Sequence, residues 1–416
     1  MDKIILGKNI VLNEENDTRP NQNTLVLGGT GCGKTMSVVI PGLAHMENSS
    51  LIGIFTKKSV VSSAALYFEQ LGYKTHVWNI ATPKKDERIP DPLSYVKGED
   101  DIEELAKQIV NANRAYSKAT KYDPYFKEAS EGLLTGLICY IFLTEESPAM
   151  KSVIDLFYQI KIKENGRGIT TSIDNIMDQL QKKAPKSTAA KKLNAFLELP
   201  YTTAVCIRDD LEKAIQNVFP VSIQNAMSKE AFLDFADISI NRTALFILTS
   251  PVRTAQYSFA NILFGLGIRE LTEFAEKQKD NHLPCDVRLI FDDFSCGFPI
   301  YNFEKYISVF RVSGISSLML CQSLSQLYAT YGEDNANTIL NNCSSIVYLP
   351  GGMNEQTAAY IAKMLGVPVK DIMFMPVGNA VVFQAGKDPV VTKRYETLKD
   401  PLCQKLLSIE EKLEIA

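Results

Sequence analysis

The chain contains the stretch Gly28-Gly29-Thr30-Gly31-Cys32-Gly33-Lys34-Thr35, a complete match to the pattern G-x-x-x-x-G-K-[ST]. It follows an apolar run at 24–27, which predicts a buried strand, and it leads into a predicted helix over 33–45. In this order the glycines let backbone N–H groups turn inward and surround phosphates at the positive end of the helix dipole. A glycine-rich turn that binds nothing is the alternative, and the order of strand, loop and helix argues against it.

The loop therefore predicts an ATP site, and all eight of its residues are candidate nucleotide-binding residues. Lys34 is expected to reach the β- and γ-phosphates, and Thr35 is expected to hold Mg²⁺. The metal ion needs a second acidic group on a nearby strand, and the predicted strand at 287–291 ends directly before Asp292 and Asp293. We expect Asp292 to bind Mg²⁺ through water and Asp293 to orient or deprotonate the attacking water. A solvated acidic pair that caps a turn is the alternative.

Two further catalytic candidates flank the next predicted strand, at 317–321. Gln322 follows this strand, where a polar side chain can touch the γ-phosphate or the attacking water; the alternative is a polar residue at a helix N-terminus. Arg311 closes a predicted helix shortly before Gly314. It suits either a cation that stabilises the C-terminus of its own helix or an arginine finger for the nucleotide of a neighbouring subunit. The spacing leaves both roles open.

Short apolar runs alternate with helical patterns in two separate parts of the chain. Such alternation predicts an α/β fold with a parallel sheet covered on both faces. In the first part, the expected strands are 24–27, 51–55 and 74–78, and the expected helices are 33–45 and 59–71. In the second part, the expected strands are 244–248, 287–291, 317–321, 345–349 and 380–383, and the expected helices are 255–277, 303–311, 324–331 and 355–365.

The segment between these parts has almost no strand signal and is expected to be an inserted helical domain. Asp292 follows Lys34 by 258 positions, whereas a compact core spans roughly 100–150 residues. The extra residues between the two motifs are independent support for an insertion. We predict a nucleotide-binding domain over 1–95 and 238–416 with an all-α domain over 96–237 inserted into it. The predicted helices of the insertion are 102–110, 124–143, 153–162, 171–180, 192–197 and 203–218.

Composition sets outer limits on the function. Of the 416 residues, 45% are apolar and 22% are charged, which is ordinary for a globular protein and excludes wholesale disorder. The formal net charge is −4, which argues against a wholly basic nucleic-acid module but allows a local basic channel. The 8 cysteines form no C-x-x-C pair and there are only 3 histidines, so a zinc site is disfavoured.

No targeting or membrane-spanning segment is expected. The N-terminus, 1–7, turns polar too early for a signal peptide. The longest apolar run, 133–143, is shorter than the about 20 residues that cross a bilayer. We therefore expect the chain itself to be soluble, with no transmembrane segment.

Several short sequence motifs follow one another in a fixed order along nearly the whole chain. In chain order, they include 23–35 (strand and P-loop), 91–96 (DPLSYV), 283–294 (LPCDVRLIFDDF), 322–327 (QSLSQL) and 351–352 (GG). This series resembles the type IV secretion coupling proteins, the TraG-type ATPases of conjugation, and in particular those of Gram-positive mobile elements. A P-loop by itself is unspecific, but the ordered series is highly specific.

The resemblance implies a RecA-like P-loop ATPase domain that assembles into a homo-hexameric ring, as in related DNA translocases. It implies that the all-α domain receives a relaxase bound to single-stranded DNA. It also implies that the protein works with secretion-channel proteins at the cytoplasmic face of the cell membrane. Arg311 matches the position of the family's proposed trans-acting arginine, which favours the finger role.

The sequence departs from the family at three places. After the second strand the family commonly has DPKGE, whereas Phe55-Thr56-Lys57-Lys58-Ser59 keeps only Lys57 in place and both acids are missing. The usual glutamate after the Walker B aspartate is replaced by Asp293, whose side chain is one methylene shorter, so hydrolysis could be slow. The membrane-spanning N-terminal segment normal for the family is absent, so an anchor was trimmed or comes from a partner.

Three functions follow from these observations. The leading one is an ATP-driven coupling motor that feeds relaxase-bound single-stranded DNA into a secretion channel. The second is a nucleotide-gated substrate receptor or scaffold with little or no ATPase activity, which Asp293 and the missing acids motivate. A chromosome-partitioning or repair translocase shares the fold, but a helical insertion of well over a hundred residues argues against it.

Overall fold

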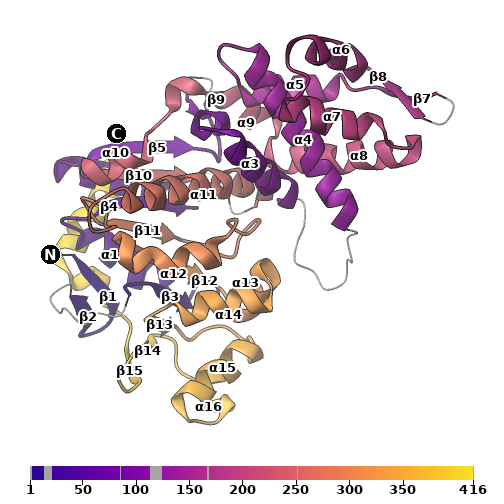
Figure 1. Ribbon diagram of the computed structural model, residues 1–416. Helices are drawn as coiled ribbons and strands as arrows, with labels where there is room; N and C mark the ends of the chain where they lie inside the picture. Colours follow the sequence, from indigo (N-terminus) through magenta and orange to yellow (C-terminus); the bar gives the residue numbers. More distant parts are fainter. Residues whose placement is uncertain are drawn as a thin grey trace. The chain divides into compact units, whose positions relative to one another are not determined.

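The computed structural model describes residues 2–13, 21–84, 86–112, 124–165, 168–250 and 252–415 (Figure 1). These residues form two compact units. The first unit comprises Met1–Ala81, Asp234–Val252 and Gly267–Ala416, and the second comprises Thr82–Leu233 and Arg253–Leu266. The boundary between Leu266 and Gly267 falls within a single long helix, α11 (Thr254–Glu276).

A nine-stranded sheet forms the centre of the first unit. Its strands are β3 (Thr24–Leu27), β4 (Ser50–Phe55), β5 (Lys74–Asn79), β10 (Thr243–Leu248), β11 (Val287–Phe291), β12 (Ile315–Cys321), β13 (Ser345–Tyr348), β14 (Asn379–Gln384) and β15 (Val390–Lys393). Their order across the sheet is β15-β14-β13-β3-β12-β11-β4-β10-β5. All neighbours run parallel except β13–β14 and β14–β15, which are antiparallel. This is the parallel-rich sheet that the sequence predicts.

The central strands are apolar on both faces because helices cover both sides of the sheet. Every residue of β3, β4, β10 and β11 is buried, as expected for parallel strands between two helical layers. The helical segments of this unit are η1 (Thr35–Val39), α1 (Ile40–Ala44), α2 (Lys58–Gln70), α10 (Phe235–Ile240), α12 (Phe303–Ser313), α13 (Leu324–Tyr331), α14 (Glu333–Asn341), α15 (Glu355–Leu365), α16 (Val369–Met373), η4 (Thr397–Lys399) and α17 (Pro401–Ile415).

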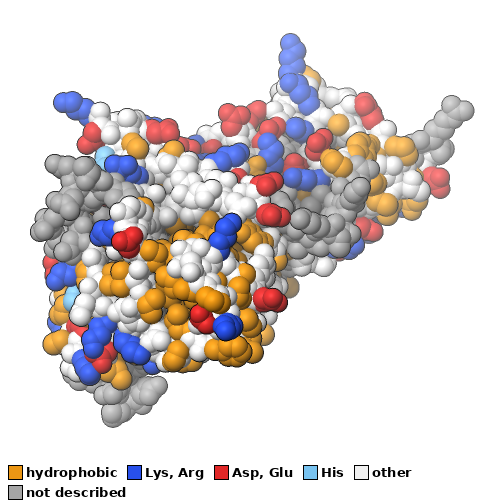
Figure 2. All heavy atoms as spheres, turned by 90° about the horizontal axis from the view of Figure 1, so that it is seen from below, with side chains coloured by type: hydrophobic (Ala, Val, Ile, Leu, Met, Phe, Trp, Pro, Cys, Tyr) orange, Lys and Arg blue, Asp and Glu red, His pale blue; other side chains and the backbone are white. Residues whose placement is uncertain are grey.

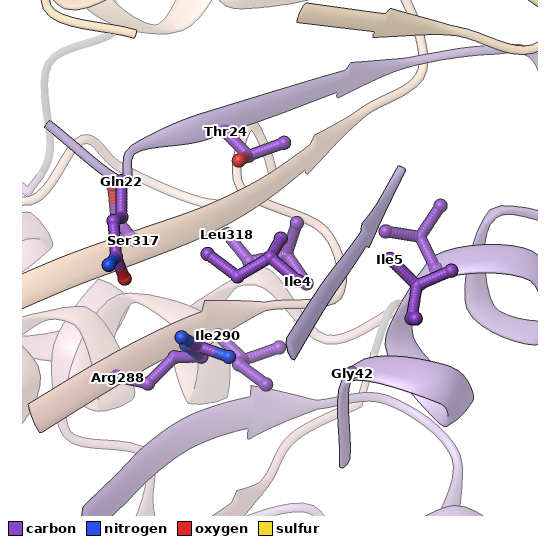
Figure 3. Close-up of a pocket in the computed structure, with 10 residues that line it drawn as sticks. Ile4, Ile5, Gln22, Thr24, Gly42, Arg288, Ile290, Ser317 and Leu318 are labelled. Carbon is purple, nitrogen blue, oxygen red and sulfur yellow. The ribbon is translucent and has the colours of Figure 1, made fainter. Parts of the chain in front are cut away.

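A small hairpin precedes the sheet and covers a small cavity beside it. The hairpin consists of β1 (Lys3–Gly7) and β2 (Ile10–Asn13). Thr24, Arg288 and Ser317 line the cavity together with apolar side chains of β1 (Figure 3). These three residues lie at or near the amino-terminal ends of β3, β11 and β12. The cavity is therefore at the opposite end of the strands from the P-loop and is not the nucleotide site.

The second unit is mainly helical. Its helical segments are η2 (Pro92–Tyr95), α3 (Glu99–Asn111), α4 (Pro124–Thr144), α5 (Met150–Tyr158), α6 (Ile173–Lys183), α7 (Thr188–Leu197), α8 (Tyr201–Val218), α9 (Val221–Ala226) and η3 (Lys229–Ala231). The N-terminal half of α11 belongs to this unit as well. Asp91 fixes its first turn, since the Asp91 carboxylate accepts hydrogen bonds from Leu93 N at 2.9 Å and from Met150 N at 2.9 Å.

The expectation of an all-α insertion was wrong in one respect, because this unit also contains strands. An antiparallel hairpin joins β7 (Ile162–Asn165) to β8 (Gly168–Thr171), and β6 (Ile89–Pro90) pairs with β9 (Met227–Ser228). Runs of two to four residues are too short to show the alternation that marks a strand in a sequence. The described unit also begins at 82 and ends at 233, with 253–266 added, whereas the predicted insertion covers 96–237.

A buried asparagine fixes the start of the P-loop strand. The Asn23 side chain is fully buried, and its Oδ1 accepts hydrogen bonds from the backbone N and the hydroxyl of Ser317, at 3.0 and 2.9 Å. Its Nδ2 donates to the carbonyl oxygen of Asn342 at 3.1 Å. One side chain thus ties the start of β3 to β12 and to the end of α14.

Replacing this asparagine should destabilise the first unit. Asn23→Ala leaves the buried Ser317 amide and the partly buried Asn342 carbonyl without this partner, and we expect the free energy of unfolding to fall by about 2–3 kcal/mol. Denaturant titration followed by circular dichroism measures this change. Asn48→Ala, at an exposed asparagine, is the matched control. A loss no larger than that of the control would contradict the prediction.

Candidate active site

Three neighbouring parallel strands bring the predicted site residues to one edge of the sheet. The P-loop follows β3, Gln322 follows β12, and Asp292 and Asp293 follow β11. Because the three strands are adjacent and parallel, their carboxyl ends meet at the same edge, where ligands bind in open α/β sheets. A hydrogen bond of 3.1 Å from Gly28 N to Cys321 O fixes the first residue of the loop against β12.

Two P-loop positions require glycine, one because other backbone lies very close to it and one because of its backbone conformation. A Cβ atom on Gly29 would lie 2.9 Å from the Cα of Gly352, in the loop after β13. Gly33 has a φ of +93°, a conformation that side chains with a Cβ rarely adopt. Gly33 leads directly into the helical turn that begins at Thr35. The loop therefore presents its amides at a helix N-terminus, as an anion site requires.

Lys34 lies across its own loop. Its Nζ donates a hydrogen bond to the carbonyl oxygen of Gly28 and another, of 3.1 Å, to that of Gly29. The ammonium group is therefore held at the start of the loop by its carbonyl oxygens.

Thr35 and Asp292 are in direct contact, although 257 positions separate them in the chain. The Thr35 hydroxyl donates to Asp292 Oδ1 at 3.0 Å. The hydroxyl of Thr56, which follows β4, donates to the other carboxylate oxygen, Oδ2, at 3.4 Å. Lys57 Nζ lies 3.5 Å from the Thr35 hydroxyl oxygen. Hydroxyl and carboxylate oxygens are the hard ligands that Mg²⁺ prefers, so this set of donors fits a magnesium ion.

Asp293 and Gln322 form a second polar chain beside the first. Gln322 Nε2 donates to Asp293 Oδ2 at 3.4 Å, and the Thr30 hydroxyl donates to Gln322 Oε1 at 3.4 Å. Burial raises the pKa of Asp293 above the ordinary value of 3.8, with the charge of Asp292 adding to this effect. The hydrogen bond from Gln322 and the charge of Lys34 oppose it. This carboxyl group is thus held more basic than an exposed aspartate.

Arg311 lies apart from these contacts. It is exposed in the last turn of α12, which ends at Gly314 in a left-handed conformation. Among the residues that the structure describes, no hydrogen bond or ion pair of its side chain is found. The arrangement leaves its guanidinium available at the surface and does not distinguish a helix-end cation from a finger.

Sequence reasoning missed two residues that contact the site. Thr56 carries no motif of its own, and only the meeting of strand ends shows that it bonds to Asp292. Thr30 was expected as a P-loop residue, but its bond to Gln322 was not. Arg394 follows β15, more than 350 residues after the P-loop, and its Nη1 lies 3.4 Å from the carbonyl oxygen of Cys32. A lone arginine near the end of a chain carries no signal that would predict this contact.

Comparison with known families identifies the chain. The family model described as "Type IV secretory system Conjugative DNA transfer" matches residues 3–368. The chain belongs to this family. The resemblance seen in its ordered strings is therefore confirmed, while no curated protein sequence matches the chain.

Solved structures of low sequence identity show the same fold as this chain. The plasmid coupling protein TrwB, in complex with ADP and Mg²⁺, is 15% identical, covers 90% of this chain and 84% of its own, and has a TM-score of 0.69. TrwB with a non-hydrolysable ATP analogue is 16% identical, covers 90% and 85%, and has a TM-score of 0.64. VirB4 of Thermoanaerobacter pseudethanolicus is 12% identical, covers 96% and 97%, and has a TM-score of 0.57. The predicted fold class, a RecA-like α/β domain with a helical domain, is confirmed, apart from the short strands that the predicted all-α insertion also contains.

None of the described helices is both long enough and apolar enough to cross a bilayer.

The raised pKa of Asp293 predicts how its substitution changes stability with pH. The Asp293 carboxyl group keeps its proton to a higher pH in the native state than in the unfolded chain. The free energy of unfolding of the wild type therefore falls as the pH rises from the ordinary pKa of aspartate through the raised pKa of Asp293. Asp293→Asn removes this titration but keeps an oxygen that can accept from Gln322. We expect the free energy of unfolding of the variant, relative to wild type, to increase between about pH 3.5 and pH 7.

Denaturant titrations of the two proteins at a series of pH values measure this difference. Asp334→Asn, at an exposed aspartate in α14, serves as the control for a general change of charge. A difference between Asp293→Asn and wild type that stays constant over this range, or that decreases, would show that the native site does not raise this pKa.

Proposed function

We propose that this protein is the ATP-hydrolysing coupling protein of a conjugative type IV secretion system. It recruits a relaxase–DNA substrate and drives its transfer into the secretion channel. The observation that carries the proposal is the 3.0 Å hydrogen bond between Thr35 of the P-loop and Asp292 at the end of β11. It joins the two motifs that an ATPase needs at one edge of a parallel sheet. The family assignment supports the conjugative role.

The proposed division of roles follows the contacts of the described residues. The amides of residues 28–35 bind the phosphates, and Lys34 moves from the loop carbonyls to the β- and γ-phosphates. Thr35 and Asp292 would hold Mg²⁺, which neutralises phosphate charge when bound. Asp293, held basic by its burial, orients the attacking water and takes its proton. Gln322, bonded to Asp293, senses the γ-phosphate. TrwB, which shares the fold, is described in complex with ADP and Mg²⁺.

A receptor or scaffold with little ATPase activity is the second candidate. Two observations favour it: the residue after Asp292 is an aspartate, one methylene shorter than a glutamate, and Phe55 and Ser59 stand where the family's DPKGE string has its two acids. Asp293 already shares a hydrogen bond with Gln322. A shorter acid that is fixed in this way would reach a water less well, and nucleotide would then serve mainly to stabilise assembly.

Assembly into a homo-hexamer is part of the proposal. The side of the molecule on which α15 and α16 lie carries a gathering of hydrophobic side chains (Figure 2). In this part of the chain, Met353 is 79% exposed and Phe374 is 76% exposed. Large exposed apolar surfaces mark interaction sites, and burial against another copy would remove this surface from water.

The remaining partners rest on the family alone. Single-stranded DNA, a relaxase and channel proteins at the cytoplasmic face of the membrane are proposed because the family acts in conjugative DNA transfer. Because the net charge is −4, binding to the phosphates of the DNA backbone would come from a local group of cationic side chains. Phosphate contacts of that kind lose affinity steeply as salt rises.

Removing the P-loop lysine should abolish turnover. Lys34→Ala takes away the cation that stabilises the transferred phosphoryl group, and we expect phosphate release to fall by a factor of at least about 100. The assay measures phosphate release with and without single-stranded DNA across protein concentration. Lys58→Ala, at an exposed lysine in α2, is the matched control. Unchanged release by Lys34→Ala would remove the motor proposal, and release at background by wild type with DNA present would favour the scaffold.

The arginine finger has its own test. Arg311→Ala should bind nucleotide as wild type does but lose the part of its hydrolysis that rises with protein concentration, because the finger acts on a neighbouring subunit's nucleotide. Nucleotide titration and turnover against protein concentration are measured in parallel. Lys305→Ala, on the same helix and also exposed, is the control. Normal concentration-dependent turnover in Arg311→Ala would leave this arginine as a helix-end cation.

A further inference from the structure

The order of the strands fixes the direction in which a nucleotide leaves the P-loop. Gln322 and Asp293, the groups for the γ-phosphate, lie on the β12 and β11 side of β3. The phosphates run in line across the loop amides, so the sugar and base must leave on the other side of β3. On that side β13 is the neighbour of β3, and β14 and β15 follow it.

The surface on this other side of β3 is built from the loop after β13 and the turn before β14. A Cβ atom on Gly351 would lie 3.3 Å from Cys32 Cβ, within the P-loop, and 3.7 Å from Cγ2 of Val377. Cys32 itself is buried, whereas Val377 is 64% exposed. The apolar side chain of Val377 is therefore exposed to solvent beside the P-loop, on the side of β3 where the base of a nucleotide would lie.

Arg394 lies over the end of the same loop. Its Nη1 donates to the carbonyl oxygen of Cys32 at 3.4 Å, and the same atom would lie 2.8 Å from a Cβ on Gly33. Met36, one turn beyond in η1, is 38% exposed. Arg394 is exposed as well, so a ligand that approaches the loop from solvent can reach its side chain.

The segment that carries Arg394 is fixed at several points. Arg394 N donates to Gly378 O at 3.0 Å, which sets it beside the turn that holds Val377. The Thr397 hydroxyl donates to the carbonyl oxygen of Met36. The Tyr395 hydroxyl donates to Asp400 Oδ2 at 2.5 Å. The arginine is therefore placed next to the loop by the fold and does not reach it from a free tail.

We propose that Arg394, Val377 and Met36 form the subsite for the base and ribose of the nucleotide bound at the P-loop. The inference rests on the proposed function, in which the loop binds a nucleoside triphosphate. Guanidinium groups stack on aromatic rings, and Val377 and Met36 supply apolar contacts to a flat, largely apolar ligand. The ligand class is a nucleotide recognised through the faces of its base.

Two substitutions test the subsite without altering the phosphate site. Arg394→Lys keeps the positive charge but removes the planar group, and Val377→Ser removes the apolar surface at an exposed position. Binding of Mg·ADP and of Mg·pyrophosphate to the full chain is measured by calorimetry. We expect each variant to weaken ADP binding about five- to tenfold and to leave pyrophosphate binding within about twofold of wild type.

The outcomes separate this proposal from the one on which it rests. Val221→Ser, at a similarly exposed valine of α9 in the second unit, should leave both ligands unaffected, and thermal unfolding checks that every variant is folded. Unchanged ADP binding in both test variants would overturn the subsite. An equal loss for ADP and pyrophosphate would also overturn it, because the residues would then act on phosphate. If wild type binds neither ligand, it is the proposed nucleotide function that fails.

Discussion

The contact between Thr35 and Asp292 is the constraint on which the site depends. It requires the carboxyl ends of β3 and β11 to lie at one edge of the sheet with β12 between them, and it requires a loop tight enough to turn Thr35 toward that edge. The close approach of Gly29 to Gly352 shows how little room the loop has. A bulky residue in the loop would push it away from the strand ends and separate the hydroxyl from the carboxylate.

The same geometry bears on the segment after β4, where the sequence departs from the family's DPKGE pattern. The strand β4 ends beside β11, so whatever follows it must face Asp292. Here that residue is Thr56, whose hydroxyl donates to Asp292 Oδ2. Phe55 and Ser59 stand where the common pattern has its two acids, so this segment carries less negative charge than that pattern would give. Lys57, which the pattern keeps, lies close to the Thr35 hydroxyl.

The C-terminal part of the chain completes the environment of the loop. The two antiparallel strands β14 and β15 extend the sheet on the side away from Gln322, and the segment after them returns to the P-loop at Arg394 and Thr397. The C-terminal part of the chain thus lies against the glycine-rich turn near its beginning. The polar residues proposed for the terminal phosphate lie on one side of β3, and apolar and cationic residues lie on the other.

The sequence by itself determined the local parts of this protein. The P-loop, the strand before Asp292 and the helix at 324–331 were predicted from runs long or regular enough to carry their own period, and the structure has them at those positions. Only the tertiary structure showed the β7–β8 hairpin, the split of the helix at 33–45 into η1 and α1, and the contacts of Thr56 and Arg394. The contacts of Thr56 and Arg394 join residues far apart in the chain, so they depend on which strands lie side by side, and a single sequence read locally contains no measure of that. The hairpin and the turn η1 are local, but their runs of four and five residues are too short to show a period of their own.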